Sequence, residues 1–298
     1  MNKFEKRWFI TTLFILAILF DVRSSFAFVN FFDVKSSDPW EATLKTEYTF
    51  ETGVDSQDGD FSVGHSELGL KKEFKLENGL PVDFGIAMDH YTIHDDTPVD
   101  LPASLQSKGI ILGAKMPMPF TTSDYLFMGV SMGAYLQSAG DHAFHSSAFR
   151  FKNRLYGIYK KDERFIFVMG VMANPDYEER AVRPFAGMQY LINDRWSIHF
   201  LSDDPFVAYR LSDRTTLKCQ LSIINDEFEV VSGSRRGEIV NINEYHIGLG
   251  VEHEIKKDMN VQGTVGWATG RKYEYLKDGG KVVPEDGIFL GLSLNLGF

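Results

Sequence analysis

Large apolar residues alternate with small or polar residues through most of the chain. In the closing segment 288–298 every even position is apolar, whereas the odd positions carry mainly glycine, serine and asparagine. The same alternation recurs in 40–50, 68–76, 82–88, 126–136, 245–251 and 259–267. Because successive side chains of a β-strand point to opposite faces, this period of two predicts strands with two chemically different faces.

The connections between these segments alternate in length. Short turns rich in charge, Asn, Asp or Pro occur at 77–81, 119–124, 160–164, 193–194, 212–213 and 256–258. Mostly longer polar stretches lie between them at 51–65, 93–107, 138–147, 174–183, 231–238 and 274–286. Such an order is typical of antiparallel hairpins that are tight at one end, and segments of about ten residues suit tilted strands crossing a hydrocarbon core. We count about fourteen strands, or about twelve if the weakest pair, 195–202 and 205–211, is a folded-in excursion.

As a pattern, residues 40–298 resemble bacterial outer-membrane β-barrels. The most specific piece is the closing strand, in which Leu294, Leu296 and the terminal Phe298 share one face; in those proteins such a strand looks like the element read by the barrel-assembly machinery. The resemblance implies an all-β, transmembrane, antiparallel up-and-down barrel of about 12–14 strands in the bacterial outer membrane. It also implies outer-membrane lipid, lipopolysaccharide and the assembly machinery as partners.

Two further expectations concern the ends and the subfamily. The closing strand is expected to pair with the first strand near Trp40, because that pairing removes an exposed sheet edge. The segment 200–221 is similar to uncharacterised barrel families, which implies a fold and no chemistry.

The first 27 residues have the layout of a secretory signal. Lys3, Lys6 and Arg7 precede an apolar run at 9–20, and small residues lead up to Ala27. This order predicts a signal peptide over 1–27 with cleavage after Ala27, a short periplasmic lead over 28–39 and a barrel over 40–298. The alternative is a buried N-terminal helix.

Charge and cysteine content exclude several classes of protein. The net charge is −10, and the predicted signal peptide carries +2, so the mature chain has −10 − 2 = −12. This acidic balance disfavours general nucleic-acid binding, which needs clustered Lys and Arg. A single cysteine, Cys219, excludes an intramolecular disulfide. The absence of long apolar runs after residue 27 excludes transmembrane helices.

A soluble secreted barrel or sandwich would also alternate, but its solvent face would be rich in charge. Here the second face is rich in Gly, Ser, Thr and Asn, and aromatic residues gather near the segment ends, as in interfacial girdles. Lys72 does not fit, since it falls on the apolar face of 68–76. Either its side chain reaches toward an interface or a bulge shifts the register locally.

Charged side chains on the second face are the main candidates for function. Arg150, Lys152 and Arg154 share one face of their segment, and Glu73, Asp83, Asp89, Glu244 and Glu252 take inward positions elsewhere. Basic and acidic rows facing each other across water would set up a transverse field that biases solute selectivity. The alternative is a ladder of salt bridges that fills the interior and leaves no channel. The inward aromatic residues are predicted to narrow the bore: Tyr125, Phe127 and Tyr135.

These features favour a porin-like channel for passive or weakly selective passage of small polar solutes. One alternative is a non-conducting structural or surface-binding barrel, for which Arg235 and Arg236 could contact lipopolysaccharide phosphates. The other is an outer-membrane hydrolase.

No catalytic, metal or cofactor residue is assigned. In a strand Ser66 points away from His65 and Glu67, so these three cannot form a triad. His145 and Ser147 lack an evident orienting carboxylate. The oxygen-rich loop 55–60 is only loosely similar to a calcium loop, because it lacks the spacing and the bidentate Glu.

Overall fold

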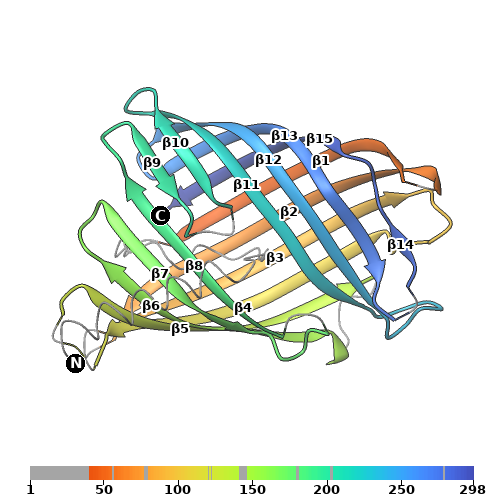
Figure 1. Ribbon diagram of the computed structural model, residues 1–298, viewed down its shortest axis with the longest axis horizontal. Helices are drawn as coiled ribbons and strands as arrows, with labels where there is room; N and C mark the ends of the chain where they lie inside the picture. The colour runs from red at the N-terminus through yellow and green to blue at the C-terminus, as the bar shows by residue number, and fades with distance from the viewer. Residues whose placement is uncertain are drawn as a thin grey trace, which may run out of the picture.

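The computed structural model describes residues 40–298, apart from 56, 77–79, 120, 122, 141–145, 179–180, 202–203 and 278. The predicted signal peptide, its cleavage site, the periplasmic lead and His145 lie outside the described residues. Within them the chain forms a closed antiparallel barrel (Figure 1). No helix of the described part is long and apolar enough to cross a membrane.

Fourteen strands make up the wall, each paired with its neighbour in sequence. They are β1 (Glu41–Val54), β2 (Gln57–Lys75), β3 (Pro81–Asp95), β4 (Ser104–Pro117), β5 (Leu126–Ala139), β6 (Phe149–Lys160), β7 (Phe165–Ala173), β8 (Val182–Leu191), β9 (Trp196–His199), β10 (Phe206–Arg210), β11 (Thr215–Val230), β12 (Ile239–Lys256), β13 (Met259–Tyr275) and β15 (Gly287–Gly297). A short helix, η1 (Ser146–Ala148), and a two-residue strand, β14 (Lys281–Val282), lie in the loops. The predicted all-β up-and-down barrel is confirmed, with the larger of the two predicted strand numbers.

Strands β1 and β15 close the barrel as expected. Their register runs from Glu41↔Gly297 to Thr49↔Phe289. Beyond it, the Trp40 N–H donates to the Phe298 carbonyl at 2.7 Å and the Phe298 N–H donates to the Trp40 carbonyl at 2.9 Å. The last residue of the chain is therefore held by backbone hydrogen bonds.

Deleting Phe298 removes both of these hydrogen bonds and the last outward aromatic residue, which is 69% exposed. We expect the amount of folded barrel recovered in outer membranes to fall several-fold, because the closing strand loses its end. The measurement is the fraction that migrates as the compact form on unheated SDS gels. Phe298→Tyr keeps the aromatic ring and is expected to assemble normally; equal recovery of the deletion would contradict an assembly role.

The strands extend beyond the predicted membrane segments. The segment 51–65, expected to be a long polar loop, is mostly strand, because β1 ends at Val54 and β2 begins at Gln57. Likewise β3 and β4 reach into 93–107, and only 96–103 connects them. The expectation of long loops at these two places is wrong, and the wall projects further at the long-loop end than the sequence indicated.

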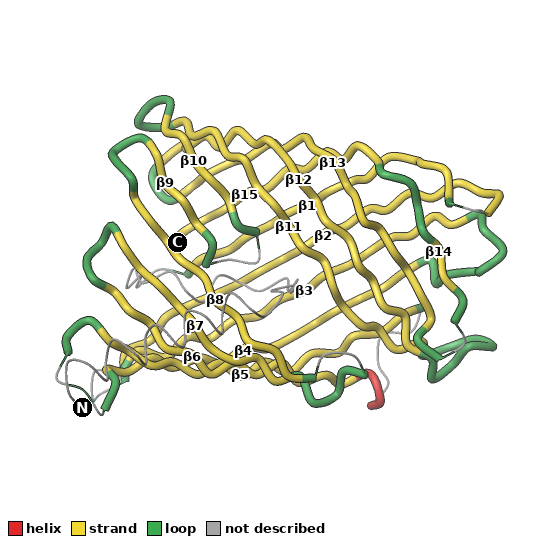
Figure 2. The backbone as a smooth tube through the Cα atoms, in the orientation of Figure 1, coloured by secondary structure: helices red, strands yellow, loops and turns green. Residues whose placement is uncertain are grey.

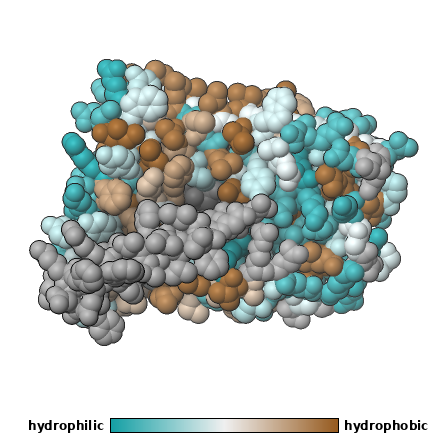
Figure 3. All heavy atoms as spheres, in the orientation of Figure 1, coloured by the Kyte–Doolittle hydropathy of each residue, from teal (hydrophilic) through white to brown (hydrophobic). Residues whose placement is uncertain are grey.

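The outer surface carries the predicted apolar faces. Large apolar side chains are about half exposed there, among them Leu44, Leu112, Leu249 and Leu290. Figure 3 shows apolar side chains over the middle of the barrel and hydrophilic ones gathered at the end with the β1–β2 hairpin and β14. This distribution is typical of a lipid-facing band.

Lys72 lies beside aromatic rings at the short-turn end of the barrel. Its Nζ atom is 5.4 Å from the centre of the Trp40 ring and 5.6 Å from that of Phe74. The β2–β3 register is continuous through Lys72↔Phe84, so no bulge is present there. The ammonium group reaches along the surface to the aromatic residues of the interface.

The wall is irregular between β8 and β11. Strands β9 and β10 have only four and five residues. At the long-loop end β11 instead pairs in parallel with β5, through Glu229↔Ser138 and Val230↔Ala139. The two short strands thus belong to the wall, but β6–β10 are bypassed at the long-loop end, where β5 and β11 meet directly.

The interior of the long-loop end is filled by an apolar cluster, which we call the outer core. Its buried members are Val54, Phe61, Val63, Tyr91, Ile93, Leu101, Leu105, Ala139, Ile224, Phe228, Val230, Val240, Ile242, Tyr273, Tyr275 and Val282. Some contacts cross the lumen: the ring centres of Phe61 and Tyr273 are 4.7 Å apart, and those of Tyr91 and Phe228 are 5.8 Å apart. Fully burying one large apolar side chain contributes ~1.5–3 kcal/mol. Separating these side chains and exposing them to water therefore costs a large free energy. The expectation of a polar inner face throughout is wrong at this end.

Candidate functional site

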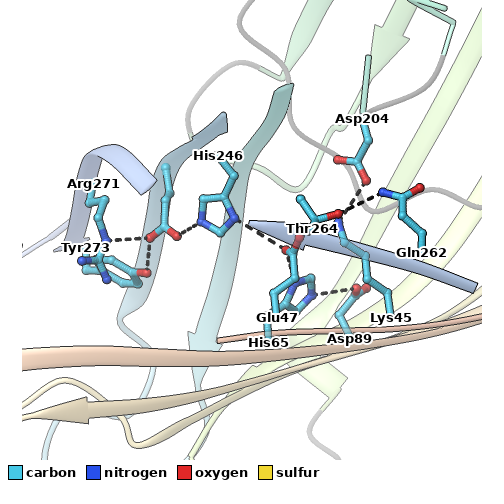
Figure 4. Close-up of polar contacts among 11 residues, drawn as sticks. Lys45, Glu47, His65, Asp89, Asp204, His246, Gln262, Thr264, Arg271 and Tyr273 are labelled. Atoms are coloured by element: carbon cyan, nitrogen blue, oxygen red, sulfur yellow. Dashed lines mark hydrogen bonds and ion pairs between the residues drawn. The ribbon is translucent and has the colours of Figure 1, made fainter. Parts of the chain in front are cut away.

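A buried layer of ionisable side chains lies inside the barrel next to the outer core (Figure 4). The alternation of β1, β2 and β12 turns Glu47, His65 and His246 inward. The Nδ1 atoms of His65 and His246 lie 3.9 and 3.6 Å from Glu47 Oε2, and His65 Nε2 lies 3.4 Å from Asp89 Oδ1. One carboxylate is thus placed between two imidazoles from opposite sides of the β1–β15 seam.

The same layer continues toward β13 through Glu244. This carboxylate contacts His246, accepts a hydrogen bond from the Tyr273 hydroxyl at 2.5 Å and lies 3.3 Å from Arg271 Nε. Arg271 is 1% exposed and also donates to Thr52 Oγ1 at 3.0 Å. A buried charge without partners is costly, so these side chains stay in contact. The contacts therefore hold the interior side chains in place at mid-height of the barrel.

Nearer the short-turn end, the inner polar side chains are partly exposed. Lys218 Nζ lies 2.7 Å from Glu252 Oε2 and 3.1 Å from Gln262 Oε1. Lys45 Nζ lies 3.0 Å from Asp204 Oδ2. The side chains of Glu252 and Asp204 are 23% and 40% exposed, so water reaches this lower part of the lumen.

Asp204 reaches Lys45 because the connection between β9 and β10 turns inward. We call its described residues, Phe200, Leu201, Asp204 and Pro205, the inner loop. Leu201 packs against an apolar cluster on the inner face of β6 and β7. Where the loop leaves β9 it passes over Gly187, and a Cβ atom built there would lie 2.1 Å from the Phe200 carbonyl oxygen. The inner loop therefore turns inward from the wall, and the Asp204 side chain reaches Lys45 on β1 and narrows the lumen.

The predicted basic row lies on the inner face of β6. Arg150, Lys152 and Arg154 are 4%, 3% and 6% exposed. Lys152 Nζ lies 2.8 Å from Asp226 Oδ1, and an Arg150 guanidinium nitrogen lies 3.5 Å from Glu229 Oε2. These two acidic partners lie between the predicted turn at 212–213 and the predicted loop at 231–238, and neither was among the predicted site residues. Asp226 shares the parity of the apolar Phe228 and Val230, and a carboxylate among apolar inward positions was the available signal.

Tyr177, in the β7–β8 connection, joins the same contacts. Its hydroxyl lies 2.8 Å from Asp226 Oδ1 and 2.7 Å from Gln137 Oε1. Burial, reinforced by the Asp226 carboxylate, raises the pKa of this hydroxyl well above its ordinary value. It stays protonated and serves as a donor. We call the group that ties β6 and the β7–β8 connection to β11 the latch: Arg150, Lys152, Tyr177, Asp226 and Glu229.

The predicted acidic residues all take inner positions, but each has a nearby cationic or imidazole partner. Lys115 Nζ lies 3.1 Å from Asp83 Oδ2 and 3.8 Å from Glu73 Oε2. Asp89, Glu244 and Glu252 contact His65, His246 and Lys218 as described above. The basic row of β6 meets the carboxylates of β11 directly rather than facing these acidic residues across water.

The three candidate constriction residues differ in placement. Tyr125 lies in the turn before β5 and is 52% exposed, so its assignment to the bore is wrong. The alternation does not extend into that turn. Phe127 packs in the inner apolar cluster with Leu201. Tyr135 is 1% exposed and lies flat on the wall, with ring atoms 2.2 and 2.5 Å from where a Cβ of Gly109 or Gly133 would be.

The structure gives little support to hydrolytic or metal chemistry. Ser66 contacts Thr46 on the outer face, away from His65, so these neighbours form no triad, as predicted. The His90–Ser104 pair is at 3.1 Å but is exposed. Among the described residues no group of His, Cys, Asp and Glu could hold a metal ion. Arg235 is bound to Glu238 at 3.3 Å and stacks over the Tyr275 ring at 4.2 Å.

The sequence has a family match over the second half of the barrel. The family model described as "Domain of unknown function (DUF6268)" matches residues 125–283. The chain belongs to this family. The match runs from just before β5 to β14 and includes the basic row of β6, the inner loop and the whole latch. A search of curated proteins found no match.

Solved barrels resemble this DUF6268 protein in outline. An outer membrane channel from Pseudomonas putida F1 aligns over 89% of this chain and 98% of its own, with 12% identity and a TM-score of 0.46. A FadL homologue from Pseudomonas aeruginosa aligns over 88% and 91%, with 11% identity and a TM-score of 0.42. The translocator domain of the autotransporter NalP from Neisseria meningitidis aligns over 89% and 90%, with 12% identity and a TM-score of 0.39. At this level of similarity no functional residue carries over.

Proposed function

We propose that this DUF6268 protein is an outer-membrane channel for passive or weakly selective passage of small polar solutes, and that its lumen is narrow. The observation that carries the proposal is the lower lumen. There Lys45, Asp204, Lys218 and Glu252 place charges of both signs on a partly exposed inner face, between the inner loop and the wall. Mixed charge on a wet inner surface favours ions and polar solutes over apolar ones.

The bore is narrower than the strand number alone would give. The outer core fills the long-loop end. The layer around Glu47, His65 and His246 is buried, and Asp204 of the inner loop reaches across the lower lumen to Lys45. We therefore expect a small conductance with frequent closures, below that of a water-filled barrel of the same number of strands. Planar-bilayer recordings on the refolded mature chain test this, and the lack of any conductance steps over a range of salt concentrations would remove the channel proposal.

Replacing Lys45 with glutamate tests the same proposal at one residue. The change turns the Lys45–Asp204 pair into two like charges where solutes pass. It makes the net charge of the lower lumen more negative by two units. We expect the preference for cations over anions to rise by about fivefold, the effect of ~1 kcal/mol. The reversal potential in a salt gradient measures it.

The matched control is Lys160→Glu, which makes the same charge change at the end of β6, before an exposed short turn. It is expected to leave the reversal potential nearly unchanged. If both variants shift the potential equally, the effect comes from overall charge rather than from the lower lumen.

The outer core favours one second candidate, a barrel that does not conduct and whose outer loops contact a partner. This candidate predicts no conductance from the wild type and from any variant that keeps the outer core. It also predicts that partner binding is lost when the 231–238 connection is shortened.

A further inference from the structure

The outer core and the latch close different parts of the barrel with different chemistry. The outer core consists of interdigitated apolar side chains that cross the axis of the long-loop end. The latch consists of ion pairs and hydrogen bonds at the side of the barrel. When polar contacts separate, water and polar solutes replace the lost partners, whereas separated apolar side chains gain none. The side closure is therefore the more easily opened of the two.

The latch lies next to an interruption of the wall, directly beside the parallel β5–β11 pairing at Glu229 and Val230. Strand β8 pairs with β9 only through Gln189–Leu191, and β10 pairs with β11 only through Thr216–Gln220. Beyond these pairs, 182–188 of β8 and 221–228 of β11 have no wall strand between them. Figure 2 shows β9 and β10 stopping far short of the end of β11.

The side chains with the outward parity on β11 become polar where the wall strand is missing. They change from the half-buried Leu221 and Ile223 to Asn225 and Glu227, which are 8% and 2% exposed, and the Glu178 N–H donates to Glu227 Oε2 at 3.0 Å. The β7–β8 connection thus contacts this part of β11, and polar contacts take the place of the missing wall strand there.

We propose that the latch closes a side entrance to the lumen, between β6 and the β7–β8 connection on one side and β11 on the other, and that small zwitterionic solutes pass through it. The inference rests on the proposed channel function. It further specifies where solutes enter the channel from outside and which class of solute passes. One wall of the entrance carries Arg150 and Lys152, and the other carries Asp226 and Glu229. A solute with both an ammonium and a carboxylate group replaces the lost partners on both walls at once, whereas a simple ion replaces them on one.

Asn174 adds a second feature that points to a polar ligand. It is 1% exposed, and neither its side-chain nitrogen nor its oxygen has a hydrogen-bond partner among the described residues. Strands β6 and β7 pair at Asn153↔Ala173, and continuing this antiparallel register by one residue places Asn174 beside Lys152. An amide at this place offers one donor group and one acceptor to a zwitterion that passes between the charged walls.

Cross-linking the latch tests the entrance. In a Cys219→Ser background, Lys152→Cys and Asp226→Cys are joined by a short bifunctional thiosulfonate reagent that a reductant cleaves. Conductance in planar bilayers and entry of free alanine into proteoliposomes are measured before and after reduction. We expect both to fall by about fivefold or more in the cross-linked form and to recover on reduction. The reduced double variant is expected to conduct at least as well as the wild type, since its latch is broken.

The matched control cross-links Thr215→Cys to His253→Cys, two paired wall residues of β11 and β12 away from the latch. This link is expected to leave conductance and alanine entry unchanged. Full passage through the cross-linked latch variant would overturn the side entrance while leaving the channel function in place. A wild type that never conducts would instead overturn the channel function itself.

Charge neutralisation tests the substrate class. Arg150→Gln combined with Glu229→Gln keeps hydrogen-bonding groups of similar size but removes the opposed charges. We expect the ratio of alanine entry to entry of uncharged lactamide, a solute of similar size, to fall by about fivefold. Compact migration on unheated SDS gels verifies that the variant is folded. An unchanged ratio in the folded variant would overturn the preference for zwitterions.

Discussion

Replacing Arg271 with leucine is expected to lower the free energy of unfolding by ~3–5 kcal/mol, the cost of leaving a buried charge without its partner. Arg271 is 1% exposed, lies 3.3 Å from Glu244 Oε2 through its Nε atom and donates to Thr52 Oγ1. Leucine fills part of the space but leaves Glu244 short of one cation. Denaturant titration of the barrel in lipid vesicles, followed by tryptophan fluorescence, measures the change.

The neighbouring Lys272 gives the matched control. Its side chain is 41% exposed, and Nζ lies 2.5 Å from Glu274 Oε2. Lys272→Leu removes an ion pair on the outer face, where such pairs contribute ~0–1 kcal/mol. Equal losses of stability from the two substitutions would show that the buried layer of Glu47, Glu244 and Arg271 does not hold the interior together.

The fold was predictable because one physical rule, the alternation of side chains across a strand, acts on every wall segment. The pairing of the closing strand with the first strand followed from this rule and the cost of an unpaired edge, and the place of Phe298 at its end from the resemblance to outer-membrane barrels. The rule also placed the side chains of Arg150, Lys152 and Arg154 on the inner face, with the correct parity.

The outer core was missed because the strands that form it continue past the membrane. Phe61, Val63 and Ile93 keep the inward parity, but they lie in stretches that were assigned to polar loops. Beyond the lipid, outward positions become polar and inward positions become apolar. The alternation therefore persists, but the apolar face now points inward. Hydropathy alone does not distinguish such an extension from a loop.

The latch and the inner loop depend on contacts between distant strands. Lys152 and Asp226 are 74 positions apart, and Lys45 and Asp204 are 159 positions apart. Each charge is visible in the sequence, but the pairings depend on the bypass of β6–β10, which follows from the shortness of β9 and β10. Their segments were recognised as the weakest pair, and this was the one sign in the sequence that the wall is irregular there.

The second large effect is expected at Gly187. A methyl group at this position would lie 2.1 Å from the Phe200 carbonyl oxygen and 3.3 Å from the Cα atom of Leu201. Both are backbone atoms of the inner loop, so Gly187→Ala forces that chain away from the wall, at a cost of ~1–3 kcal/mol for overpacking. Displacement of the loop separates Leu201 from its apolar neighbours and Asp204 from Lys45. We therefore expect single-channel conductance to rise severalfold, because the lower lumen loses what narrows it.

Gly263 supplies the control for this prediction. It lies on β13, and a Cβ atom built there has no heavy atom within 4 Å, so Gly263→Ala is expected to change neither stability nor conductance. Planar-bilayer recordings compare the two variants with the wild type at one salt concentration. If Gly187→Ala keeps wild-type conductance although its unfolding free energy falls, the inner loop does not limit the current, and the narrowest point lies at the buried Glu47 layer or at the latch.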